Sequence, residues 1–235
     1  MNKKSFTKLT VMAIIAVFTF AAIPQNTFAQ LSKKQEKALT KKAKATAKQW
    51  EKQGWEISGS VNSLEDALFD FYSKQATDNA QFKVGAVSQC RSINVCRKNA
   101  LFNAQTDYVQ EISQEIKGIA DEVVNNNPSL KLETDGFSGT FVGKMKADVS
   151  GILIESFSRV REKDGVKEFE TYFIINKLKE GTARTSALEQ ALKETQLTVD
   201  QIDTVSKFID DKFKEDDDVK SKAVESDLNS DSDDD

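Results

Sequence analysis

The dipeptide Asp164-Gly165 constrains the fold more than any other feature of this chain, because it separates two strand-like runs. A two-residue hairpin turn of this kind needs positive φ at both positions, which Asp and Gly tolerate. The runs are "ILIESFSRVREK" and "VKEFETYFII", so the sequence predicts a β-hairpin with a fixed register. In that register charge meets opposite charge and apolar meets apolar. The expected pairs are Arg161–Glu168, Val160–Phe169, Arg159–Glu170, Phe157–Tyr172 and Ile154–Ile175.

A lysine-rich helix is predicted over residues 33–53. Ser32 and Gln35 have the spacing of a capping box, in which two side chains satisfy backbone N–H groups of the first turn. Apolar residues then recur every three or four positions as far as Trp50, and Gly54 suits the left-handed residue that ends a helix. The segment 30–54 contains eight lysines and two glutamates, which gives it a net charge of +6.

The middle of the chain is expected to form the core of the fold. A second helix is expected over 63–76, and the alternating segment 81–88 is expected to be a strand. A long amphipathic helix should follow over 92–124, with its apolar stripe at Cys96, Ala100, Ala104, Tyr108, Ile112, Ile116, Ile119 and Val123. An antiparallel sheet with the long helix across one face packs these elements economically. We therefore predict an α+β fold with a strand-helix-strand-strand core and flanking N- and C-terminal helices.

Five segments are expected along the chain: a signal peptide (1–29), a basic amphipathic helix (30–54), an α+β core domain (55–180), C-terminal helices (181–213) and an acidic tail (214–235). The C-terminal helices should be two short ones, broken near Leu197-Thr198. The tail has no aromatic residue and is predicted to be disordered, because it has too little apolar surface to bury. The secondary structure of the glycine-rich stretch 132–151 is ambiguous from the sequence.

The first 29 residues have the pattern of a secretory signal. Lys3, Lys4 and Lys8 precede an apolar run over 11–22 that is too short to span a bilayer, and Ala29 suits signal-peptidase cleavage. No cysteine lies near this position, so lipid attachment there is not expected. The sequence thus predicts an exported chain without a later transmembrane segment, located in the periplasm or secreted to the outer surface.

The core segment resembles a known family. The strand "KVGAVS", the helix "VCRKNALFNAQTDYVQEISQEIKG" and the hairpin strands with Ser156 and Arg159 are similar to the twenty-kilodalton outer-membrane lipoprotein family and its flagellar basal-disk relatives. Related uncharacterised exported bacterial proteins have a "GW" turn before such a domain, as at Gly54-Trp55. The resemblance covers about residues 55–177 and implies an envelope or surface role with no catalytic residues. The chain lacks the lipid-bearing cysteine of the lipoproteins, so anchoring of that kind is not expected.

The two cysteines, Cys90 and Cys96, lie between the predicted strand and the long helix. The chain contains no histidine, so a four-ligand zinc site is not expected, and the spacing does not match a C-x-x-C redox pair. Export favours a disulfide, which is feasible if Cys90 lies in the strand-to-helix turn and Cys96 in the first helical turn. The alternative is that Cys96 is a small buried residue on the helix stripe.

Other catalytic and metal-binding patterns are weak. Without histidine, neither a Ser-His-Asp triad nor an H-E-x-x-H zinc site can form. Paired carboxylates can hydrolyse glycosides, and Glu155, Glu168 and Glu170 lie on the predicted strands. The two nearest arginines are already matched with Glu168 and Glu170 in the predicted hairpin, so ion pairing is the alternative interpretation.

Near the C-terminus, Asp227, Asn229 and Asp231 have the spacing that begins an EF-hand loop, although Ser232 replaces the sixth-position glycine. These three residues are candidate calcium ligands, and a solvated acidic tail is the alternative.

We expect an exported, non-enzymatic cell-envelope or secreted protein that acts through protein or surface contacts, including self-association through a sheet edge. No cofactor and no nucleic-acid partner are expected. One alternative is a carrier that binds a small ligand between the long helix and the sheet, and another is a hydrolase that uses carboxylates alone. The lysine-rich helix is suited to anionic lipid headgroups or to the chain's own acidic tail, and a solvated charged face is its other interpretation.

Overall fold

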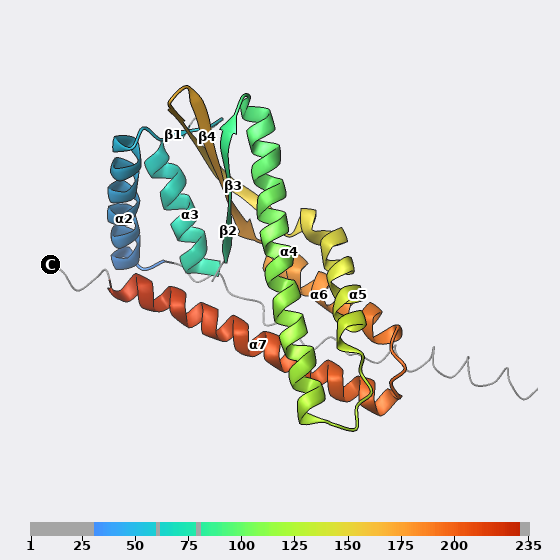
Figure 1. Cartoon of the computed structure of the whole chain (residues 1–235). Coiled ribbons are helices and arrows are strands. Elements are labelled where there is room, and N and C mark those ends of the chain that lie inside the picture. Colours follow the sequence, from blue (N-terminus) through green and yellow to red (C-terminus); the bar gives the residue numbers. More distant parts are fainter. Residues whose placement is uncertain (1–30, 60–61, 79–80, 231–235) are drawn as a thin grey trace, which may run out of the picture.

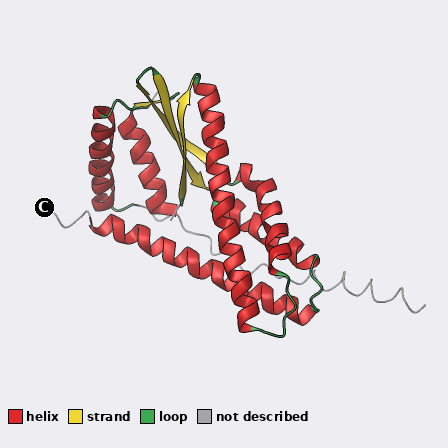
Figure 2. Ribbon diagram, in the orientation of Figure 1, coloured by secondary structure: helices red, strands yellow, loops and turns green. Residues whose placement is uncertain are grey.

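The computed structural model describes residues 31–59, 62–78 and 81–230, and all side chains in these ranges except those of 78 and 216–230. The predicted signal peptide lies outside the described residues. An antiparallel sheet with the strand order β1-β3-β4-β2 forms the middle layer. Helices α2 and α3 cover one face, and the long helix α4 crosses the other (Figure 1; Figure 2 distinguishes helices from strands). The predicted α+β class, with a long helix on the sheet and flanking helices, is confirmed.

Helices α2 (Lys33–Lys52) and α3 (Leu64–Asp78) agree with the predicted segments. The capping box forms, with the Gln35 N–H donating to the Ser32 hydroxyl and the Gln35 side chain accepting from the Ser32 N–H. The apolar seam of α2 packs against α3 and the sheet, and it buries Leu39, Ala43 and Ala47. Seven of its eight lysines are exposed, and Lys42 is half-buried, with its ammonium group 5.2 Å from the ring centroid of Tyr72 on α3.

Strand β2 (Phe82–Cys90) and helix α4 (Ile93–Asn126) pack directly on each other. The eight predicted stripe residues of α4 are all buried. A Cβ atom built on Gly85 would lie 2.6 Å from the carbonyl carbon of Ala100 and nearer still to its oxygen. Glycine on β2 and alanine on α4 therefore allow the helix backbone to approach the strand closely.

Strands β3 (Leu153–Lys163) and β4 (Val166–Ile175) form the predicted hairpin, with φ of 55° at Asp164 and 77° at Gly165. The register is confirmed for four of the five predicted pairs: Arg161–Glu168, Val160–Phe169, Arg159–Glu170 and Phe157–Tyr172.

The fifth predicted pair, Ile154 with Ile175, is wrong. The register shifts between Glu155 and Phe157, so that Ile154 pairs with Ile174 and Ile175 pairs with Leu153. The extra residue of this β-bulge turns the first part of β3 over, which buries Leu153 and leaves Ile154 exposed.

Two elements were not expected from the sequence. The two-residue strand β1 (Glu56–Ile57), in the segment interpreted as a turn-rich link, pairs with β3. Helix α5 (Thr134–Asp148), followed by a short 3₁₀ turn (Val149–Gly151), forms in the glycine-rich stretch. Burial of Phe137, Phe141 and Met145 stabilises α5 despite its three glycines, because packing outweighs intrinsic helix propensity.

Helices α6 (Lys177–Lys193) and α7 (Val199–Ser230) follow, with the break near the predicted position, but the prediction of two short helices is wrong for α7, which has 32 residues. The core boundary placed at residue 180 falls inside α6, since the Asn176 side chain caps this helix by accepting from the Lys179 N–H. The segment 214–230, predicted to be disordered, continues α7 in the structure. Its lysines follow aspartates at a spacing of four residues, and oppositely charged pairs at this spacing stabilise a helix.

Candidate functional site

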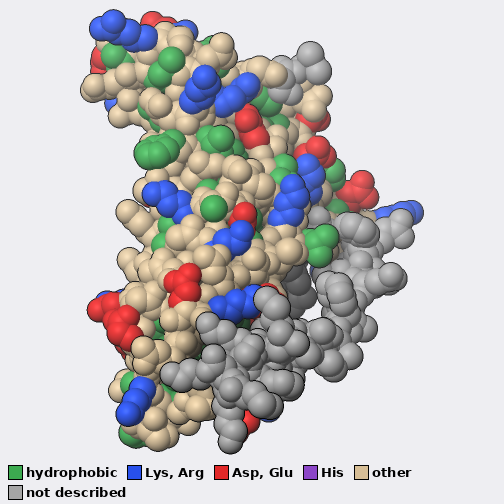
Figure 3. All heavy atoms as spheres, turned by 90° about the vertical axis from the view of Figure 1, so that its right-hand side faces the viewer, with side chains coloured by type: hydrophobic (Ala, Val, Ile, Leu, Met, Phe, Trp, Pro, Cys, Tyr) green, Lys and Arg blue, Asp and Glu red, His purple; other side chains and the backbone are tan. Residues whose placement is uncertain are grey.

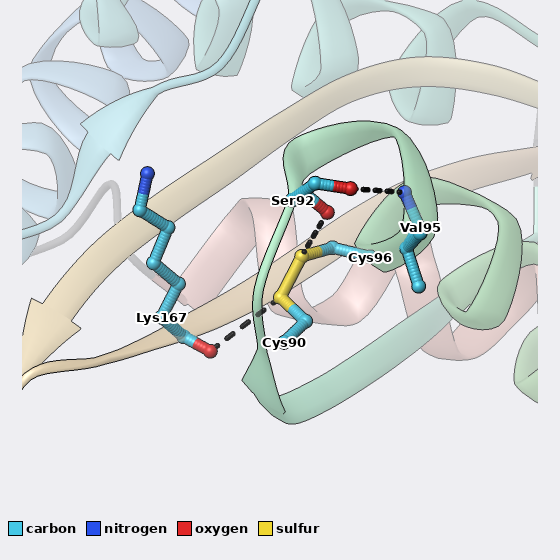
Figure 4. The surroundings of a disulfide bond; sticks show 5 residues. All are labelled: Cys90, Ser92, Val95, Cys96 and Lys167. Atoms are coloured by element: carbon cyan, nitrogen blue, oxygen red, sulfur yellow. Dashed lines mark hydrogen bonds between the residues drawn. A yellow bond between two sulfur atoms is a disulfide. The ribbon is translucent and has the colours of Figure 1, made fainter.

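The corner between β2 and α4 contains the two cysteines (Figure 4). Cys90 ends β2, Cys96 lies in the first turn of α4, and a disulfide joins them across a Cα–Cα distance of 5.5 Å. The Ser92 hydroxyl caps the helix by accepting from the Val95 N–H at 3.4 Å. The two sulfurs lie against the carbonyl oxygens of Ser92 and Lys167, and an oxidised sulfur has no hydrogen to donate. Both cysteines are buried, so this disulfide is suited to fastening the strand to the helix.

Arg159 is stacked between two indole rings on the opposite face of the sheet. Its guanidinium carbon lies 3.6 Å from the ring centroid of Trp50 and 4.2 Å from that of Trp55. Its Nε and Nη2 donate to one carboxylate oxygen of Glu170, with a distance of 2.9 Å from Nε. Trp50 belongs to α2 and Trp55 directly precedes β1, so this one side chain connects both elements to the hairpin.

The other two glutamates considered for hydrolysis also have partners. Glu168 accepts from Arg161 across the hairpin. Glu155 accepts from the Ser158 hydroxyl at 2.8 Å and lies 3.4 Å from the Arg97 side chain of α4. These carboxylates are therefore arranged as ion pairs and hydrogen-bond acceptors.

A buried polar cluster between α4 and α6 was not predicted. The Tyr108 hydroxyl donates to Glu180 at 2.7 Å, and Arg184 lies 3.2 Å from the same carboxylate. Arg184 also reaches Glu115 at 3.3 Å, and Lys177 lies 3.4 Å from Glu180. Glu180 is only 3% exposed, so these contacts replace the water that its carboxylate would otherwise bind.

Burial, and secondly the adjacent Glu180 carboxylate, raise the pKa of Tyr108 above its ordinary value of 10.0. The spacing of residues in α6 indicates this cluster. Glu180 and Arg184 are four residues apart, and they share a helix face with the small residues Ala183, Ala187 and Ala191. Charged residues beside such an apolar stripe indicate a buried ion pair, but only once the helix is known to begin before residue 180.

Two crevices flank this cluster, and Glu180 and Arg184 border both. The first, of about 220 Å³, lies between α6 and α7 and includes Phe213. The second, of about 350 Å³, lies between α4, α6 and the end of the sheet, and the Lys83–Glu111 ion pair is part of its lining. The second crevice is where a ligand between the long helix and the sheet would bind. The charged groups around it already contact one another, so a charged ligand would have to replace existing ion pairs.

Strand β2 lies at the edge of the sheet and has β4 as its one strand neighbour among the described residues. Ile175 donates its N–H to the Gln81 carbonyl, so alternate residues from Gln81 onward face β4. The backbone groups of Phe82, Val84 and Ala86 therefore point away from the sheet. The Asn103 side chain of α4 donates to the Ala86 carbonyl at 2.8 Å and covers one point of this edge.

Metal binding has little support in the described side chains, which contain no group of three or more Cys, Asp or Glu placed to bind a metal ion. Asp227 and Asn229 lie on the helical backbone of α7, where their side chains are not described, and Asp231 lies outside the described residues. Calcium binding there stays a prediction.

Across the described part of the chain, every helix is too short or too polar to cross a membrane. Comparison of the chain with protein-family models, with curated proteins and with solved structures found no match, so the resemblance to the lipoprotein family stays a prediction.

Proposed function

We propose that this chain is an exported, non-enzymatic envelope or secreted protein that acts by binding a protein partner through the edge of its sheet. The observation that carries the proposal is the nine-residue edge strand β2, with the backbone groups of three residues directed outward. An unpaired edge of this length is a template onto which another chain adds a strand.

The surroundings of β2 support this interaction. Phe82 at its start is 44% exposed, which leaves an aromatic side chain beside the open backbone groups. Natural edge strands that avoid pairing are usually short, bulged or covered. In β2 the register irregularity occurs only after Val87, and Asn103 covers a single carbonyl group in the first part of the strand.

A pull-down tests the proposal. The mature chain, residues 30–235, is tagged and incubated with native envelope extract. Ala86→Lys places a charge on the exposed edge, and Ala147→Lys makes the same change at an exposed position of α5. The unsubstituted chain and the α5 variant should retain the same partner, or a second copy of the chain, and the edge variant should lose it. Retention by all three, or by none, contradicts the proposal.

Export is tested separately by fractionating cells of the native source. The expected result is a chain cleaved near Ala29 and recovered outside the cytoplasm. An uncleaved chain in the cytoplasm contradicts the exported part of the proposal and leaves the edge contact to be judged by the pull-down.

The 350 Å³ crevice favours a second candidate, a small-ligand carrier, because its volume is within the range of about 300–1,000 Å³ for small-molecule sites. Native mass spectrometry of the chain purified from its source distinguishes the two. A stoichiometric small molecule that is lost in a Lys83→Glu variant would support the carrier.

A further inference from the structure

The lysines of α2 form one continuous stripe along the helix. Lysines at residues 34, 37, 41, 44, 48 and 52 follow one another at intervals of three or four, which places them on the same helix face. With about 100° per residue, these six and Lys33 lie within an arc of about 100°. All seven side chains are exposed, and the buried residues Leu39, Ala43 and Ala47 are on the opposite side. We call this set of seven lysines the lysine stripe.

The stripe is long, straight and peripheral. The 20 residues of α2 extend over about 30 Å. In Figure 1, α2 forms the outer flank of the molecule, with α3 between it and the sheet. On the face turned to the viewer in Figure 3, by contrast, basic, acidic and apolar side chains are interspersed. The lysine stripe thus places seven positive charges along an outer edge of the molecule, and the exposed Glu51 is the acidic residue of α2 that lies within the same arc.

The stripe is suited to electrostatic contact without insertion. Among the described residues, the large apolar side chains that are exposed lie on other elements, and α2 contributes none. Its own aromatic residue, Trp50, packs on Arg159. A helix that inserts into a bilayer needs a free apolar face, whereas that of α2 is already used in the fold. Lysine ammonium groups act as compact point charges, which suit headgroup phosphates and do not require bidentate geometry.

We infer that the lysine stripe of α2 docks the protein on a bilayer surface rich in anionic lipid headgroups. A linear array of seven lysines with one glutamate, extending over about 30 Å, matches a flat anionic surface better than a small anion. The inference rests on the proposed export, which places the chain beside the envelope, but it does not depend on the edge of β2. The two surfaces lie on different elements, so one protein can use both.

Vesicle co-sedimentation tests the inference with the purified mature chain, residues 30–235. The chain should bind vesicles of phosphatidylglycerol and phosphatidylcholine, should not bind pure phosphatidylcholine, and should be released by high salt. The triple variant Lys37→Gln/Lys44→Gln/Lys48→Gln should bind about 100-fold more weakly. The control triple variant changes three exposed lysines outside the stripe, Lys131→Gln, Lys146→Gln and Lys163→Gln, and should bind as the unsubstituted chain does.

Three results overturn the inference: equal binding to neutral vesicles, equal loss in both triple variants, and no binding to anionic vesicles. The third result needs one more variant, because the segment 210–235 carries twelve acidic residues and four lysines. If binding appears only when residues 216–235 are removed, the stripe is occupied by the chain's own acidic segment, and lipid docking is rejected for the full chain. These measurements use purified protein, so their failure is distinct from a failure of export or of the β2 contact.

Discussion

Replacing Gly85 with alanine tests whether α4 rests directly on β2. The added methyl carbon would lie 2.6 Å from the Ala100 carbonyl carbon, whereas nonbonded carbons approach to about 3.5 Å. The obstructing atoms belong to the backbone of α4, so the helix itself must move by about 1 Å. Overpacking of this kind destabilises a core by about 1–3 kcal/mol. For a chain of this size the midpoint of thermal unfolding should fall by about 2–12 °C.

Gly118→Ala in the same helix is the matched control. Gly118 is exposed, and no heavy atom lies within 4 Å of a Cβ built on it. Alanine is favoured over glycine inside a helix by about 0.5–1 kcal/mol, so this variant should unfold at a higher temperature. Thermal unfolding followed by circular dichroism compares the two. An unchanged midpoint for Gly85→Ala would refute the close approach, because a looser helix would accommodate the methyl group.

Three further predictions concern other parts of the fold. Cys90→Ala/Cys96→Ala should lower the free energy of unfolding by about 2 kcal/mol, the value for a short disulfide loop, and thiol labelling of the unsubstituted chain should require prior reduction. Arg159→Lys keeps the charge but loses the planar stacking between two indoles, so chemical denaturation should show a loss of about 1–2 kcal/mol; an unchanged midpoint argues against the stack. Burial raises the pKa of both Tyr108 and Tyr172 above 10.0, so the unfolded chain releases these protons first. The contribution of these two tyrosines to the free energy of unfolding should therefore be fully present below pH 10 and be lost as the pH rises above it. In Tyr108→Phe the free energy of unfolding should fall less steeply with pH, and a free energy that does not change with pH in that range would contradict this.

Elements that depend on turn residues or on regular apolar spacing could be predicted from the sequence. The Asp164-Gly165 turn determines the hairpin register near it, and the regular stripe from Cys96 to Val123 identifies α4. The prediction failed at Ile154 because a β-bulge depends on what packs against both faces of the strand, which a register counted from the turn does not include. The sequence left the segment of α5 unassigned, because the burial of Phe141 against other helices is a tertiary effect.

The candidate sites were less predictable than the fold. The geometry of a disulfide required Cys96 in the first turn of the helix, as found, and Cys90 in the preceding turn, whereas Cys90 is the last residue of β2. The cluster of Tyr108, Glu180 and Arg184 could not be anticipated, since its members are up to 76 residues apart and meet only when α4 and α6 pack together. The openness of the β2 edge likewise depends on the strand order of the whole sheet.

Amide hydrogen exchange on β2 tests the central claim, that a partner pairs with the edge of the sheet, most directly. The mature chain is measured alone and with the partner retained in the pull-down. The N–H groups of Val84 and Ala86 point outward, while those of Lys83 and Gly85 already face β4. The account predicts that the partner slows exchange at Val84 and Ala86 and leaves Lys83 and Gly85 unchanged. Unaltered exchange at Val84 and Ala86 in the bound state would contradict it.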